Sequence, residues 1–189
     1  MDTLIGIAVG IGLSAACGFR VFVPLLVMNL ASLNGLLHLS PGFAWIGSHY
    51  ATIAFATATA VEILGYYIPG LDHVLDLIAT PAAVVAGTVV TASTITDLSP
   101  FLKWTLSLIA GGGIAGLVQG STAALRAGSF VTTAGIGNPV VATLELAGAI
   151  GTALLAILVP VLCLILLGIL GILVIFKAGR SLLQRMHRV

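Results

Sequence analysis

Charged side chains are scarce in this sequence of 189 residues. Only 7% of the residues are Asp, Glu, Lys or Arg, whereas soluble domains average about 25%. Hydrophobic residues make up 59% of the chain, and the mean hydropathy is +1.22. A soluble domain is therefore excluded as the expected class. The composition predicts an all-α integral membrane protein with a surface suited to lipid.

Cysteine is almost absent, since the chain contains only Cys17 and Cys163. Both lie in apolar runs, where a thiol usually behaves as a small hydrophobic group. Two cysteines so far apart exclude a disulfide framework and a CxxC metal site. No cofactor is expected. The net charge of +1 gives no electrostatic reason to expect nucleic acid as a partner.

Apolar runs divided by short polar links predict a polytopic transmembrane bundle of about six spans, because each span needs roughly 20 apolar residues. Gly18, Arg20 and Pro24 interrupt the first run, so we expect a broken helix there. The expected spans cover approximately residues 3–31, 43–68, 72–93, 101–125, 139–148 and 153–177.

The fifth span is the hardest to place, because residues 139–176 are almost wholly apolar. A turn is expected at Gly148–Thr152. Asn138 as N-cap and Pro139 at the first helical position predict a helix start, so residues 139–148 would form a half-helix. Whether the segment from Ser129 to Gly148 crosses fully or is re-entrant stays open.

The two halves of the chain share an order of features: a glycine-rich helix, an arginine, and a later helix with one glutamate. Arg20 and Glu62 follow this order in residues 1–94, and Arg126 and Glu145 follow it in residues 101–178. Three crossings in each half would make the halves inverted repeats, an arrangement found in many secondary transporters.

The C-terminal tail, residues 179–189, sets the expected orientation. Arg180, Arg185 and Arg188 in the tail and Lys177 just before it are four of the seven Lys and Arg residues. By the positive-inside rule the tail is expected to be cytoplasmic, with the protein in the plasma membrane. Six crossings would place the N-terminus in the cytoplasm as well.

Charges inside predicted spans are costly and normally face a partner or a water-filled cavity. Arg20 and Arg126 are expected to bind an anionic group, and Glu62 or Glu145 to carry a coupling proton. Arg20 and Glu62 are expected to lie together at membrane depth. The structural alternative is that Arg/Glu pairs only lock helices together, or that an arginine reaches the headgroups.

Backbone N–H groups are expected to assist the arginines. Gly18, Gly120 and Asn138 stand near predicted breaks or starts of helices, where free N–H groups attract anions. We therefore include these three residues in the expected substrate site.

Asp72, His73 and Asp76 form a second polar group, with the two aspartates one helical turn apart. They could relay a proton, so Asp72 and Asp76 join the expected proton-coupling or ion-pair residues. Metal binding is not expected, because Asp72 also suits a helix cap and no further ligand follows at the required spacing.

Small-xxx-small spacing appears at Gly6 and Gly10 and again at Gly112, Gly116 and Gly120. Such helix faces allow close approach of neighbouring helices. Contact within one chain and contact in a homo-oligomer both remain open.

Several short motifs together resemble a bacterial membrane family called domain of unknown function 4126. The resemblance spans most of the chain. It implies a small multi-helix membrane protein and supplies no activity. The motifs are Ala16-Cys17-Gly18-Phe19-Arg20 with Pro24, Glu62 to Pro69-Gly70, Thr80-Pro81, Gly120-Ser121-Thr122 and Gly137-Asn138-Pro139.

These observations lead us to expect a secondary, proton-coupled transporter for a small anionic solute or an anionic lipid headgroup, with membrane lipid as a partner. A lipid-phosphate flippase is favoured instead if the polar site opens sideways to lipid. A scaffold or accessory subunit is the alternative of another class, and a sealed, dry interior would support it. An enzyme is not expected, because no paired nucleophile and base is visible.

Overall fold

The structure is a computed structural model that describes the backbone of residues 3–68 and 71–186, and the side chains of these residues except 72, 73, 174, 175 and 177–186. The described backbone is all-helical, as predicted, and has no strand. Its elements are α1 (Thr3–Phe19), α2 (Phe22–Leu33), the 3-10 segment η1 (Pro41–Gly47), α3 (His49–Tyr66), α4 (Leu71–Thr94), α5 (Pro100–Leu106), the π-helical segment η2 (Ser107–Gly112), α6 (Gly113–Thr133), α7 (Asn138–Leu158) and α8 (Pro160–Met186).

Three stretches of the described chain are long and apolar enough to cross a membrane. They are Val74–Thr94 in α4, the run Pro100–Thr133 through α5, η2 and α6, and the whole of α7. The helices α1 and α2 and the first part of α8, Pro160–Leu173, are apolar but shorter. These lengths are compatible with a membrane protein.

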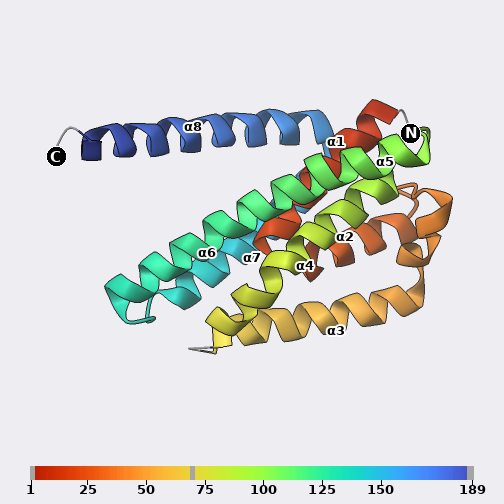
Figure 1. The fold of residues 1–189 in the computed structure, drawn as a ribbon. Helices are drawn as coiled ribbons and strands as arrows, with labels where there is room; N and C mark the ends of the chain where they lie inside the picture. Colours follow the sequence, from red (N-terminus) through yellow and green to blue (C-terminus); the bar gives the residue numbers. More distant parts are fainter. Residues whose placement is uncertain (1–2, 69–70, 187–189) are drawn as a thin grey trace.

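The first apolar run is broken, as predicted, but its two pieces form a hairpin and do not continue as one kinked span. At the start of α1, Thr3 donates a hydrogen bond to Asp97 at 3.3 Å. After α2 the chain returns to that end of α4, where the Ser40 N–H donates to the carbonyl oxygen of Ser93 at 2.8 Å. The hairpin of α1 and α2 therefore enters and leaves at one end of the bundle (Figure 1).

The turn of this hairpin lies at Arg20 and Val21, between the end of α1 and the start of α2. Pro24 stands in the first turn of α2. Proline is tolerated there because the first N–H groups of a helix have no intrahelical partner. The proline that predicted a break therefore helps to start the second helix.

The predicted half-helix at residues 139–148 is wrong, because α7 continues without a break through the expected turn at Gly148–Thr152. The helix ends instead at Val159, whose φ of −141° and ψ of 67° are not helical. A residue before proline is disfavoured in the helical region. Pro160 then occupies the first position of α8, where its missing N–H costs little.

Helix α1 lies at the centre of the bundle and packs against α4, α6 and α7. Figure 1 shows α3 along one side of the bundle and α8 along the opposite side. The π-helical segment η2 packs against α4, where a Cβ atom on Gly87 would lie 2.8 Å from the carbonyl oxygen of Gly111. Glycine at these two positions lets the two backbones approach closely.

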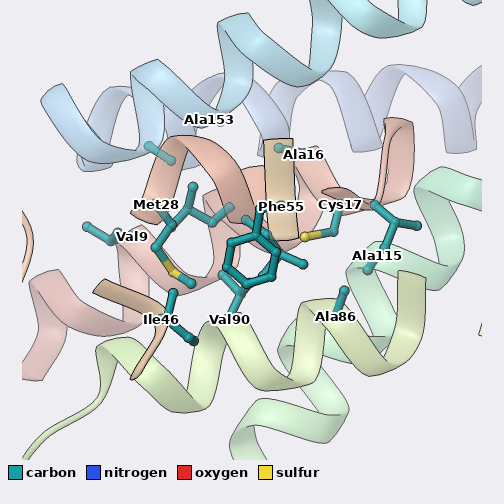
Figure 2. Packing of buried hydrophobic residues seen from close by; sticks show 14 of the residues in the cluster. Val9, Ala16, Cys17, Met28, Ile46, Phe55, Ala86, Val90, Ala115 and Ala153 are labelled. Atoms are coloured by element: carbon teal, nitrogen blue, oxygen red, sulfur yellow. The ribbon is translucent and has the colours of Figure 1, made fainter. Parts of the chain in front are cut away.

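Small side chains fill much of the core (Figure 2). The core residues shown in Figure 2 include Val9, Ala16, Cys17, Met28, Ile46, Phe55, Val90, Ala115 and Ala153.

The predicted glycine faces make helix contacts within one chain. A Cβ atom on Gly10 would lie 2.9 Å from Thr91 Cα, and one on Gly116 would lie 3.0 Å from Val84 Cγ2. Gly120 is an exception, because nothing lies within 4 Å of its Cβ position.

Gly12→Ala is expected to destabilise the bundle by about 1–3 kcal/mol, the usual cost of overpacking. The new methyl group would lie 2.6 Å from Ala156 Cβ and 3.1 Å from Cys163 Sγ. Gly168→Ala is the matched control, because it is also helical and has nothing within 4 Å. Thermal unfolding in detergent measures both variants, and equal melting temperatures would contradict the packing.

Candidate functional site

The tip of the α1–α2 hairpin lies deep in the bundle. Helix α1 runs antiparallel to α4, with Thr3 bonded to Asp97 and the Ser14 hydroxyl donating to the carbonyl oxygen of Gly87 at 2.7 Å. The same register places Arg20 beside the middle of the 24-residue helix α4. A hairpin of this depth brings Arg20 to the other charged residues of the bundle.

Arg20 is almost completely buried, with 1% of its surface exposed. Its Nη2 atom lies 3.3 Å from Glu145 Oε2 and donates to the carbonyl oxygen of Ala142 at 3.1 Å. Its guanidinium carbon lies 3.7 Å from the centroid of the Tyr66 ring, within cation–π range. Helix α7 and helix α3 therefore both hold this side chain at the hairpin tip.

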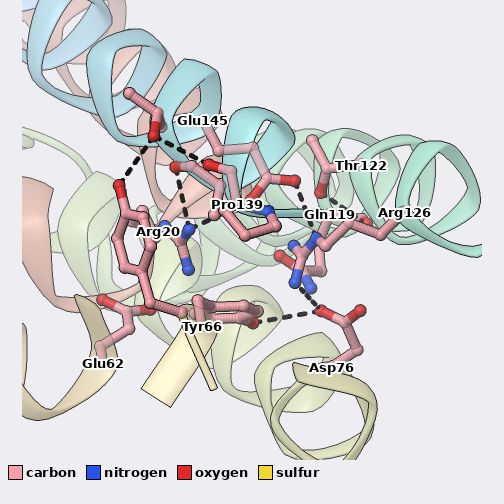
Figure 3. A network of polar contacts seen from close by, with 12 residues as sticks. Arg20, Glu62, Tyr66, Asp76, Gln119, Thr122, Arg126, Pro139 and Glu145 are labelled. Atoms are coloured by element: carbon pink, nitrogen blue, oxygen red, sulfur yellow. Dashed lines mark hydrogen bonds and ion pairs between the residues drawn. The ribbon is translucent and has the colours of Figure 1, made fainter. Parts of the chain in front are cut away.

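Arg126 of α6 is equally buried and shares two of these partners. Its Nε donates to Glu145 Oε1 at 2.9 Å, and its Nη1 donates to Asp76 Oδ1 at 2.5 Å. Its guanidinium carbon lies 4.3 Å from the centroid of the Tyr66 ring. The Tyr66 hydroxyl also donates to Asp76 Oδ1, at 3.1 Å. Figure 3 shows the two arginines converging on Glu145.

Glu62 has a different role from the one that the sequence predicts. Its Oε1 accepts the backbone N–H of Val21 at 2.7 Å, and its Oε2 accepts that of Phe22 at 3.1 Å. The carboxylate therefore caps the N-terminus of α2, where N–H groups and the helix dipole favour negative charge. Arg20 and Glu62 lie close together, as expected, but Glu62 binds the backbone of the residues that follow Arg20, and the ion pair of Arg20 is with Glu145.

We call Arg20, Glu62, Tyr66, Asp76, Arg126 and Glu145 the charged network. The four side chains of this network that form ion pairs are 1% to 13% exposed. It holds two guanidinium groups and three carboxyl groups, all from described residues. If every group is ionised, one negative charge is left over. Arg20 Nε, Arg20 Nη1 and Arg126 Nη2 have no hydrogen-bond partner within the described part of the chain.

Tyr66 is the residue of the network that the sequence analysis missed, because paired tyrosines before a Pro-Gly turn are typical of a membrane interface. It lies one helical turn after Glu62 in α3 and is 3% exposed. The i, i+4 spacing from a buried glutamate is the signal that could have identified it.

The predicted glycines of the site, Gly18 and Gly120, are not part of the charged network. A Cβ atom on Gly18 would lie 2.6 Å from the carbonyl oxygen of Ala115, so Gly18 serves helix packing. Gly120 is exposed. Asn138 is buried at the start of α7, two turns before Glu145. The side chain of Asp72 lies outside the described residues. Among the described side chains, no group of three His, Cys, Asp or Glu residues is placed to hold a metal ion.

A groove of about 550 Å³, here called the lateral groove, lies between α2, α3 and α4. It reaches the charged network at Glu62 and Tyr66, and Thr57 is the other polar side chain in its wall. Its apolar lining consists of Val21, Phe22, Ile53, Ala54, Ala58, Val61, Leu75, Ile78, Ala79 and Ala82.

The family model described as domain of unknown function, DUF4126, matches residues 7–180. The chain belongs to this family. The DUF4126 match covers the hairpin, the charged network and the lateral groove. No curated protein and no solved structure matches the chain.

The pairing of Arg20 with Glu145 predicts a specific double-mutant cycle. Glu145→Ala leaves two arginines without a shared counter-ion and is expected to cost about 3–5 kcal/mol, as does loss of one partner of a buried ion pair. Arg20→Met combined with Glu145→Ala is expected to cost less than the sum of the single changes. Unfolding in a mild detergent measures the four proteins.

The same cycle between Arg20→Met and Glu62→Gln is the control. Its coupling is expected to be smaller, because Glu62 bonds to backbone groups. Additive behaviour of Arg20 with Glu145 would contradict the ion pair.

Proposed function

We propose that this DUF4126 protein is inserted in the plasma membrane as five crossings and one re-entrant hairpin. The crossings are α3, α4, the α5–η2–α6 run, α7 and α8, and the hairpin is α1–α2. Exposed aromatic residues at one end, Trp45, Tyr50 and Trp104, support a membrane interface at that position. The hairpin takes the place of the first of the six crossings expected from the sequence, so five crossings remain.

This arrangement also supports part of the proposed inverted repeat. Helix α3 with Glu62 and helix α7 with Glu145 run in opposite directions, because α3 begins at the end of the bundle where α7 finishes (Figure 1). Helices α4 and α8 are opposed in the same way. The hairpin has no counterpart in the second half, where one continuous helical run occupies its place.

Five crossings would place the two chain ends on opposite sides of the membrane. In a background where Cys17 and Cys163 are replaced by alanine, Thr3→Cys is expected to react with an impermeant maleimide in intact cells, and Gln184→Cys only after lysis. The basic tail is then cytoplasmic. Protection of both positions in intact cells would restore six crossings.

We further propose that the protein is a proton-coupled transporter for a small acidic group. The observation that carries this proposal is a pair of buried arginines, Arg20 at the tip of the re-entrant hairpin and Arg126 on α6, with three guanidinium nitrogens that have no partner among the described residues. Charges at membrane depth are costly and usually serve a transported group. A guanidinium is also well suited to bind carboxylate or phosphate.

Charge balance supports coupling to a proton. The network already holds three carboxyl groups against two guanidiniums, so a further anion would raise the excess of negative charge in a medium that opposes it. An anion that displaces Glu145 from the arginines can be accommodated if Glu145 takes up a proton at the same time. Anion and proton would then cross together.

The lateral groove supports the lipid-headgroup version of this proposal, since it leads sideways from the network. The burial of Arg20 and Arg126, each 1% exposed, supports the scaffold alternative, because a sealed ion-pair network is what a scaffold requires. Flux measurements separate these functions.

Proteoliposomes that contain a pH-sensitive dye are expected to acidify inside when inorganic phosphate or malonate is added outside. Arg20→Gln and Glu145→Gln are expected to reduce the initial rate at least tenfold, because one removes an anion partner and the other removes the coupled proton site. His38→Gln, a change in an exposed loop, is the control. Acidification with neither anion, or wild-type rates in both network variants, would favour the scaffold.

A further inference from the structure

The lateral groove is open on the outer side of the bundle. Its wall includes Ile53, Val61 and Ile78, which are 68%, 65% and 61% exposed. All three belong to α3 and α4, two of the proposed crossings. In a membrane this apolar opening would face the hydrocarbon chains of lipid.

The buried part of the groove wall is polar, and the two arginines, which do not line the groove themselves, pack on the ring of its lining residue Tyr66. Glu62 and Tyr66 line it there. Both oxygens of Glu62 already accept backbone N–H groups of α2, so this carboxylate is partly neutralised. Tyr66 holds the guanidinium of Arg20 and that of Arg126 against its ring. A ligand that follows the groove inward therefore approaches two buried cations.

We infer that the lateral groove holds the apolar chain of an acidic amphiphile, whose headgroup reaches Arg20 and Arg126. This inference rests on the proposed transport function and names the substrate class. A free anion has no use for an apolar groove, whereas a hydrocarbon chain that ends in a carboxylate or a phosphate matches both parts of the site. The groove keeps the chain in contact with lipid while the headgroup exchanges with Glu145 at the guanidiniums.

No covalent bond changes in this exchange. The headgroup enters as an anion, a proton moves onto the Glu145 carboxylate, and the total charge of the network stays the same. Release reverses both steps. An amphiphile of this class therefore moves as an electroneutral pair of acid anion and proton.

Photo-crosslinking tests the inference without measuring transport. A fatty acid that carries a diazirine in its chain is added to the full-length protein in nanodiscs, and crosslinked peptides are mapped by mass spectrometry. Labels are expected on α3 and α4 around Ala58 and Ala82, and Ala58→Trp, which fills the groove, is expected to reduce them at least fivefold. Ala56→Trp is the matched control, because Ala56 is an exposed residue of α3 outside the groove lining.

A second arm tests the acidic headgroup. The corresponding diazirine-bearing alcohol is expected to label the groove several-fold less, and Arg20→Gln is expected to remove the preference for the acid. Equal labelling in Ala58→Trp and Ala56→Trp, or equal labelling by acid and alcohol, would overturn the inference. Retained anion-driven acidification together with absent groove labelling would reject the amphiphile and leave the transporter proposal standing. Groove labelling without acidification by either anion would support the amphiphile site and reject the transporter proposal.

Discussion

The contact of Glu145 with both arginines is the interaction on which the rest of the structure depends. Arg20 comes from the hairpin tip and Arg126 from α6; without this carboxylate Arg20 would be an unpaired charge in the core, and Arg126 would keep Asp76 as its one acidic partner among the described residues. An unpaired buried charge costs several kcal/mol, more than most packing contacts contribute. The depth of the hairpin and the packing of α6 against α7 are therefore tied to one side chain.

The hairpin can reach that depth because α1 is built from small residues. Along the helix, Gly10 meets α4, Gly12 meets α7 and Gly18 meets α6, each at a distance that leaves no room for a Cβ atom. Breaking the chain at Arg20 would also expose backbone N–H groups in the bundle, where unsatisfied polar groups are costly. Glu62 satisfies two of them. Close packing and capping together allow irregular backbone at this position.

The sequence predicted the parts of this fold that follow from composition and local chemistry. Apolar runs predicted the helices, and Gly18 with Arg20 and Pro24 predicted the first break. The reversal of the chain at that break depends on contacts of Thr3 and Ser40 with the far end of α4, which no local pattern encodes. The charged residues were identified, but their pairing was not, because Glu145 lies 125 positions from Arg20 in sequence.

The sharing of Glu145 gives the network a way to connect the two halves of the chain. Protonation would weaken its contact with Arg20 and its contact with Arg126 together, since one carboxylate serves both. Among the described residues, Arg126 would keep Asp76, whereas Arg20 would keep the Ala142 carbonyl oxygen and the Tyr66 ring and no carboxylate in direct contact. The hairpin tip is therefore the part that a proton on Glu145 would loosen most. Glu62 would still bind the start of α2, so the movement would turn Arg20 about a fixed point beside the lateral groove.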